Sequence, residues 1–172
     1  MKQFEAKERT LNGVTFYIRP LPAFKAANIS GEIFSLILPL LGSLAPLAGK
    51  VNAGEGEGLF DIKSEDAAPI LSQGLSKLGG DQVEQLLNKL LIKHKNVSVD
   101  INGDDNPILL TEDLANEVLC TNVQDMYVLA FDVIQSNYSG FFGKLSSQFG
   151  GLLGELQGLI RKKPQGSTST GS

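Results

Sequence analysis

Seventeen consecutive residues without a charge, residues 33–49, constrain this chain more than any other feature of its sequence. The stretch is IFSLILPLLGSLAPLAG, and Glu32 and Lys50 bound it. As a helix it would cover roughly 25 Å at about 1.5 Å per residue, which is less than the roughly 30 Å of a bilayer's hydrocarbon core. We therefore expect the stretch to be buried in the protein's own core or against a partner, without stable insertion into a membrane.

Two prolines, Pro39 and Pro46, lie inside this stretch, and each disfavours helix at the residue before it. The sequence therefore predicts a helix that begins near Ala23 and continues as two short helical pieces. Several apolar residues would fall near one face of these pieces: Ile29, Ile33, Leu36 or Ile37, Leu40 and Leu44. Such a face predicts a surface that binds other apolar surfaces, not an active site.

The composition indicates one globular domain with appendages. A chain of 172 residues with 42% hydrophobic residues is long enough and apolar enough to build a core. A formal net charge of -4 argues against binding to nucleic acid, which normally requires a basic face. The tight basic cluster at residues 161–163 fits the end of a helix better than a phosphate site.

The chain has one cysteine and one histidine. One chain can therefore form neither a disulfide nor a zinc site that uses several cysteine and histidine ligands. The first ten residues, MKQFEAKERT, mix charged and apolar side chains, unlike a secretory signal peptide. We expect a cytoplasmic protein that uses no metal or other cofactor.

Two β-hairpins are expected. Residues 3–19 alternate in polarity on both sides of Asn12-Gly13, a pair that tolerates the positive φ angles of a tight turn. The same signature returns near residues 97–110 around Asn102-Gly103, where additional polar residues predict a longer loop.

Helices account for most of the remaining chain. Ser64 is the expected N-cap of a helix that stops at Gly79-Gly80, and Asp81 begins a second helix that ends near His94. Thr111 is expected to cap a third.

Thr121 with Gln124 forms a capping box that either restarts or continues this third helix, and a long central helix is expected to follow. Its apolar residues recur at helical spacing: Val123, Met126, Tyr127, Ala130, Phe131, Val133, Ile134, Tyr138, Phe141 and Phe142.

The pattern weakens after Gly143. Glycines at four positions between residues 150 and 158 each cost a helix about 1 kcal/mol relative to alanine, so we expect residues 146–163 to be helical only against a partner. Residues 164–172 should be disordered, and the glycine and glutamate residues of 51–58 should form a loop. The expected fold is mainly α with small β-hairpins, an α+β domain over residues 1–145.

No pattern in the sequence indicates catalysis or metal binding. His94 sits between two lysines at a helix end, and Cys120 is expected to be a small hydrophobic residue of the core. Residues 100–105 lack the spacing of a calcium loop, and the glutamates within residues 54–58 would repel phosphate. We expect a protein that is not an enzyme.

Two blocks of sequence, residues 12–41 and 109–142, carry a resemblance to a known family. In the first, YIRPLPA follows the expected hairpin and leads into a helix and the uncharged stretch. In the second, NVQDMYVLAFDVI lies in the late helix. In this order of elements, the chain resembles the tail assembly chaperones of long-tailed bacteriophages.

The resemblance implies a mostly helical protein of the host bacterial cytoplasm, absent from the mature virion. Its client would be the long, apolar tape measure protein, which it would coat and keep soluble while helping to recruit major tail protein, the tube subunit. An exposed apolar surface also predicts self-association before the client arrives. The family provides no binding motif, so the candidate partner-binding residues are chosen for their apolar character: Ile33, Phe34, Ile37, Leu40, Leu41, Leu44, Phe141, Phe142, Leu152 and Leu156.

Two other classes of protein remain open. In a structural component of a phage tail or neck, the same apolar segments would form permanent contacts between subunits. A membrane-active protein would place residues 29–49 or 140–160 at a bilayer, but the uncharged stretch lacks the lysine and arginine typical of interfacial helices.

Overall fold

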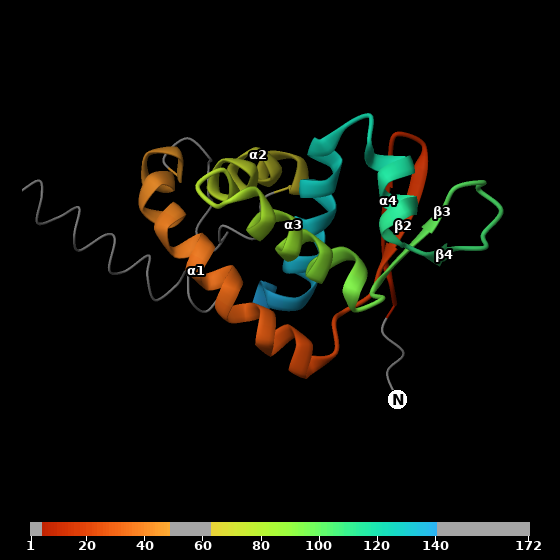
Figure 1. Cartoon of the computed structure of the whole chain (residues 1–172), viewed down its shortest axis with the longest axis horizontal. Coiled ribbons are helices and arrows are strands. Elements are labelled where there is room, and N and C mark those ends of the chain that lie inside the picture. Colours follow the sequence, from red (N-terminus) through yellow and green to blue (C-terminus); the bar gives the residue numbers. More distant parts are fainter. Residues whose placement is uncertain (1–4, 49–62, 141–172) are drawn as a thin grey trace, which may run out of the picture.

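The computed structural model describes residues 5–48 and 63–140, and for residues 36–48 and Ile70 it describes the backbone alone. Helices and a small sheet make an α+β fold, as expected (Figure 1). The labelled elements, in chain order, are β1 (Lys7–Leu11), β2 (Val14–Ile18), α1 (Ala23–Ala48), α2 (Ser64–Leu75), α3 (Gly80–Asn88), the π-helix η1 (Lys89–Lys93), β3 (Val97–Asp100), β4 (Ile108–Leu109) and α4 (Glu112–Leu119). A further helix occupies 123–140 and is called the long helix below.

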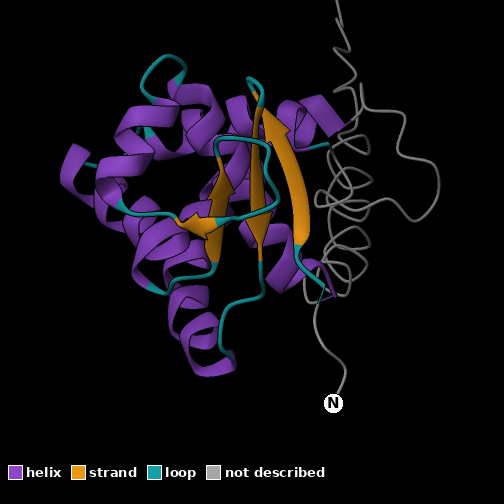
Figure 2. Ribbon diagram, turned by 90° about the vertical axis from the view of Figure 1, so that its right-hand side faces the viewer, coloured by secondary structure: helices purple, strands orange, loops and turns teal. Residues whose placement is uncertain are grey.

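The strands form one antiparallel sheet in the order β1-β2-β3-β4. Asn12 and Gly13 make the tight turn between β1 and β2, with φ angles of 50° and 82°. Both expected hairpins are therefore present, and pairing of β2 with β3 joins them into a single sheet (Figure 2).

One face of the sheet carries the core. Phe16 and Ile18 of β2 lie opposite Val99 and Val97 of β3, and all four are at most 1% exposed. Because side chains alternate along a strand, Lys7 and Arg9 of β1 lie on this same face. Two cations thus point toward the helices and not toward solvent on the outer face.

The long helix is central, as expected from its wide apolar face. Residues 128–134 are all buried, which is possible only where a helix is covered on nearly every side. In Figure 1 this teal-to-blue helix runs through the middle of the molecule, with the sheet to one side, α1 and α2 to the other, and α3 in front of it.

The prediction of two short helical pieces in the uncharged stretch is wrong. α1 continues through Pro39 and Pro46 as a single helix. Each proline removes one backbone hydrogen bond, but the two lie seven residues apart, which is about two turns at 3.6 residues per turn. Both interruptions therefore fall on the same side of the helix, and the backbone on the other sides remains helical.

Two helix ends differ from the expected ones. Ser64 does not cap α2; the cap is Lys63, and the Ser64 hydroxyl instead donates a hydrogen bond to Asp132 at 2.6 Å. Gly79 and Gly80 do not stop α2, which already ends at Leu75. They start α3, with Gly79 in the extended conformation of an N-cap.

The caps after β4 are partly as expected. The Thr111 hydroxyl accepts a hydrogen bond from the Leu114 amide at 3.3 Å, so Thr111 caps α4 as predicted. The long helix is capped by Asn122 and not by Thr121, because the Asn122 side chain accepts from the Gln124 amide at 3.2 Å.

Cys120 is exposed, so its assignment to the core was wrong. The buried face of α4 carries Ala115 and Leu119, four residues apart. Cys120 is one residue further on, about 100° around the helix, and its thiol donates to the Glu117 carbonyl at 3.4 Å.

Candidate functional site

The structure divides the predicted partner-binding residues into three groups. Ile33 is 2% exposed and belongs to the core, while Phe34 is half-buried against it. Four residues lie on the C-terminal half of α1, where the backbone is helical: Ile37, Leu40, Leu41 and Leu44. The remaining four lie outside the described residues: Phe141, Phe142, Leu152 and Leu156.

The first part of α1 is held by specific contacts. Ile29 and Ile33, one turn apart, are buried in the core. Glu32 forms an ion pair with Lys89 of η1 at 2.6 Å, and the Tyr138 hydroxyl donates a hydrogen bond to the Ala26 carbonyl. Burial raises the pKa of Tyr138 to about 12, so the hydroxyl keeps this proton at neutral pH.

A groove of about 600 Å³ opens between α2, α3, η1, α4 and the long helix. The volume is in the range of roughly 300–1,000 Å³ that is typical of ligand-binding sites. Its floor is buried and apolar, with Leu75, Leu87, Leu91 and Ala115. Half-buried apolar side chains line its walls: Leu78, Val83, Ile92, Met126 and Tyr127.

The rim of the groove is polar and acidic. Among the described residues that line it, the charged ones are Glu84 of α3 and Glu112 of α4, and both are exposed. Sequence reasoning missed this groove, because helical spacing in the second helix does not show how the neighbouring helices pack around it.

The helix beside the groove is irregular. α3 passes directly into the π-helix η1, whose hydrogen bonds span five residues in place of four. Short π segments of this kind occur frequently at functional sites. Ile92 of η1 lines the groove, so the irregular turn shapes the groove's wall.

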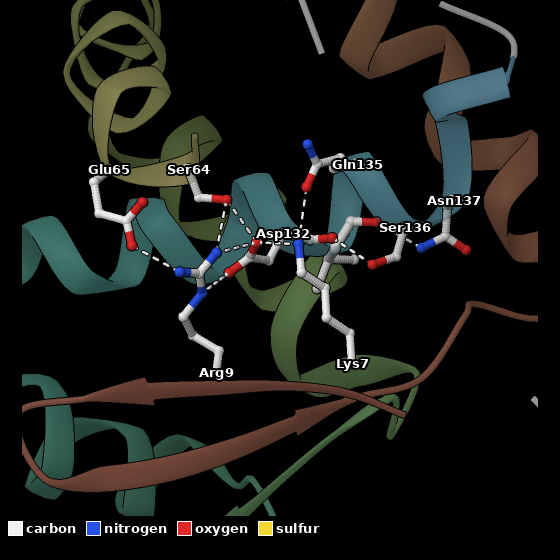
Figure 3. A network of polar contacts seen from close by, with 9 residues as sticks. Lys7, Arg9, Ser64, Glu65, Asp132, Gln135, Ser136 and Asn137 are labelled. Atoms are coloured by element: carbon white, nitrogen blue, oxygen red, sulfur yellow. Dashed lines mark hydrogen bonds and ion pairs between the residues drawn. The ribbon is translucent and has the colours of Figure 1, made fainter. Parts of the chain in front are cut away.

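A buried cluster of charges links the sheet to the helices (Figure 3). The side chain of Asp132, on the long helix, is 0% exposed and accepts hydrogen bonds from Arg9 at 2.6 and 2.8 Å and from Lys7 at 2.6 Å. Ser64 donates a further hydrogen bond to it, and Glu65 pairs with Arg9 at 2.7 Å.

Burial alone would raise the pKa of Asp132, but the hydrogen bonds from Arg9, Lys7 and Ser64 more than offset it and lower the pKa below its usual value. A carboxylate held ionised by two cations has its oxygen atoms occupied. The cluster joins β1, α2 and the long helix, and sequence reasoning missed it as well.

His94 and Asp100, which were considered for chemistry, lie in the described part of the chain. His94 caps the end of η1, where burial and nearby lysines lower its pKa. Asp100 accepts hydrogen bonds from the amides of Gly103 and Asp105, as a carboxylate does at a hairpin tip. Within residues 5–48 and 63–140, no three histidine, cysteine or acidic side chains converge as a metal site would require.

Among the residues that the structure describes, no helix combines the length and the apolar character that crossing a bilayer would need.

Taken together, the structure is that of a small α+β protein with a largely apolar groove among its helices. The family model for the phage tail assembly chaperone protein, TAC, matches residues 12–153. The chain therefore belongs to the phage tail assembly chaperone family, as the resemblance of its sequence had indicated. Comparison with curated proteins and with solved structures gave no match.

Proposed function

We propose that this protein binds the tape measure protein in the host cytoplasm and keeps it soluble. It then helps to recruit tail tube subunits and leaves before the virion is complete. Membership of the tail assembly chaperone family supports the general role. The observation that supports binding of the tape measure protein is the uncharged stretch, which continues α1 as one helix to Ala48.

A long apolar client aggregates unless its helices are covered, and covering them requires a surface that binds by burial of area and not by reaction. Residues 37–48 contain no charged residue and lie on one continuous helix. Burial of such a surface contributes about 25 cal/mol per Å² of apolar area removed from water. The free protein covers this surface by self-association until the client is available.

Co-expression tests the proposal. A tape measure fragment should be soluble with this protein and insoluble without it, because a ligand that binds only the soluble state shifts the equilibrium by mass action. Equal solubility in both conditions would refute client binding. Detection of the protein at stoichiometric levels in purified virions would instead favour a permanent tail or neck subunit.

Leu41→Asp tests the surface itself. If Leu41 contacts the client, the variant should lose rescue of the fragment while the free energy of unfolding changes by no more than about 0.5 kcal/mol. Phe24→Asp is the matched control on the same helix, because Phe24 is 90% exposed and precedes the uncharged stretch. A Leu41→Asp variant that melts normally and still rescues the client would remove Leu41 from the binding surface.

A further inference from the structure

We propose that the groove between α2, α3, η1, α4 and the long helix binds an amphipathic helix of the client whose apolar face is flanked by lysine or arginine. This inference rests on the proposed function for the identity of the client. It adds a second binding surface, distinct from the uncharged half of α1, and a rule for which helices that surface accepts.

The lining of the groove supports a helix as the occupant. Most of its lining side chains are apolar, and they come from several helical segments that surround one space. An amphipathic helix buries side chains at positions i, i+3 or i+4 and i+7 in such a groove. A volume of about 600 Å³ accommodates a few such side chains, and not a whole helix.

The charges at the rim determine which charge a bound helix should carry beside its apolar face. Glu84 and Glu112 come from different helices, and among the described lining residues they are not accompanied by lysine or arginine. A helix with acidic flanks would be repelled, whereas lysine or arginine beside its apolar face would pair with both glutamates. Electrostatic complementarity of this kind contributes more to selection among partners than to affinity.

The walls can adapt to different apolar side chains. Met126 has an unbranched side chain that adjusts to irregular shapes, and methionine is common at surfaces that bind several partners. Tyr127 adds a rigid aromatic surface with a polar tip next to it. A chaperone that binds successive helices of one client needs this combination.

Two labelled peptides serve as probes for the full-length protein. Both are about 18 residues long, so that a helix can form, with leucine at i, i+3, i+4 and i+7. One carries lysine beside the leucine face and the other carries glutamate. Fluorescence anisotropy at low salt should give at least about fivefold tighter binding of the lysine peptide, and the difference should shrink as salt screens the charges.

Paired variants locate the binding. Glu84→Lys should weaken the lysine peptide about fivefold and strengthen the glutamate peptide, whereas Glu117→Lys, an exposed α4 residue outside the groove, should change neither. Val83→Gln should weaken both peptides about tenfold. Its control is Val123→Gln, because Val123 is 58% exposed and does not line the groove. Thermal melts establish that each variant is folded.

The outcomes separate this inference from the proposed function. If the wild type rescues the tape measure fragment but Glu84→Lys and Val83→Gln bind both peptides as the wild type does, the groove proposal is overturned and the chaperone function stands. If the peptides bind as expected but the fragment is not rescued, the groove stands and the proposed client is wrong. If the groove variants change only the oligomeric state, a second copy occupies the groove, which also overturns the proposal.

Discussion

Replacement of Asp132 by asparagine tests whether the ion pairs of Asp132 with Lys7 and Arg9 stabilise the fold. The substitution preserves the shape of the side chain but removes its charge. Lys7 and Arg9 then face a neutral amide in place of a carboxylate that is 0% exposed (Figure 3). The amide nitrogen also brings two donors toward side chains that are themselves donors, so at least one hydrogen bond of the wild type cannot be kept.

The expected cost follows from the burial of the partners. Loss of one member of a buried ion pair costs about 3–5 kcal/mol, because the remaining charges stay uncompensated. Here the side chain of Lys7 is 37% exposed and that of Arg9 is 20% exposed, and Arg9 keeps its ion pair with Glu65. Water and Glu65 therefore compensate part of the charge on Lys7 and Arg9. We expect the free energy of unfolding to fall by about 3 kcal/mol, the lower end of that range.

Urea denaturation followed by circular dichroism measures this cost. With a slope of about 2 kcal/mol per M, a loss of about 3 kcal/mol lowers the midpoint by about 1.5 M urea. Asp113→Asn is the control, because Asp113 is exposed in the first turn of α4, where loss of a charge costs no more than about 1 kcal/mol.

The same pair of proteins gives a pH dependence with a definite sign. The folded-state pKa of Asp132 is lowered, so the ionised carboxylate stabilises the fold above its unfolded pKa of about 3.9. That contribution is lost as the pH falls through the lower, folded-state pKa. The difference in stability between the wild type and Asp132→Asn should therefore be largest near pH 7 and should shrink below about pH 4. A difference in stability under about 1 kcal/mol at pH 7, or one that does not depend on pH, would refute the claim that ionised Asp132 stabilises the fold.

Three further predictions concern the core, a helix cap and the chain's one histidine and one cysteine. Leu90→Ala should cost about 2–5 kcal/mol in urea denaturation, because Leu90 is 1% exposed and its loss leaves a cavity, whereas Leu109→Ala, at a 44% exposed position, should cost less than about 1 kcal/mol. Thr111→Ala should lower the free energy of unfolding by about 1 kcal/mol, because α4 loses its N-cap hydrogen bond. Thr111→Ser keeps a hydroxyl and should retain most of that stability. Equal stability of the two variants would show that the hydroxyl of Thr111 does not stabilise α4. The double variant His94→Ala and Cys120→Ala should still rescue the tape measure fragment, with or without a chelator, and loss of rescue in a folded double variant would reopen a metal or catalytic role.

The hairpins could be predicted from sequence because their signals are local. Asn12-Gly13 determines a tight turn through the backbone freedom of two adjacent residues, and the structure has positive φ at both. The pairing of β2 with β3 could not be predicted in this way. It brings Phe16 opposite Val99, and nothing in either strand's own sequence specifies a partner so far along the chain.

The charged cluster was missed for the same physical reason. Asp132 is separated from Lys7 by 125 residues and from Arg9 by 123. A usable signal was nevertheless present, because Asp132 is an acidic residue in the middle of the apolar run VLAFDVI. A carboxylate at such a position requires a cation from elsewhere, and the alternating Lys7 and Arg9 of the first strand were suitable candidates.

The groove exists because some apolar side chains of the helices around it are only partly covered. How much of each side chain is covered depends on how the helices pack together. Helical spacing places Val83, Leu87 and Leu91 on one face of their helix. Only the packing of α2, α4 and the long helix determines that Leu87 and Leu91 are buried while Val83 stays half-exposed. Periodicity gives the direction of a side chain but not the extent of its burial.

The uncharged stretch and the groove differ in what they can recognise. Glu32 is the last charged residue before the stretch, and it is already paired with Lys89. Beyond it, α1 has only apolar and small side chains up to Ala48, so this half of the helix can recognise apolar area but not charge. The groove adds Glu84 and Glu112 to its apolar walls, and as a helix-binding site it would therefore reject a helix whose flanks are acidic. A client with many apolar helices would bind to the first surface by area and would be sorted at the second by charge, which is why Leu41→Asp should abolish rescue whereas Glu84→Lys should change which helices are bound.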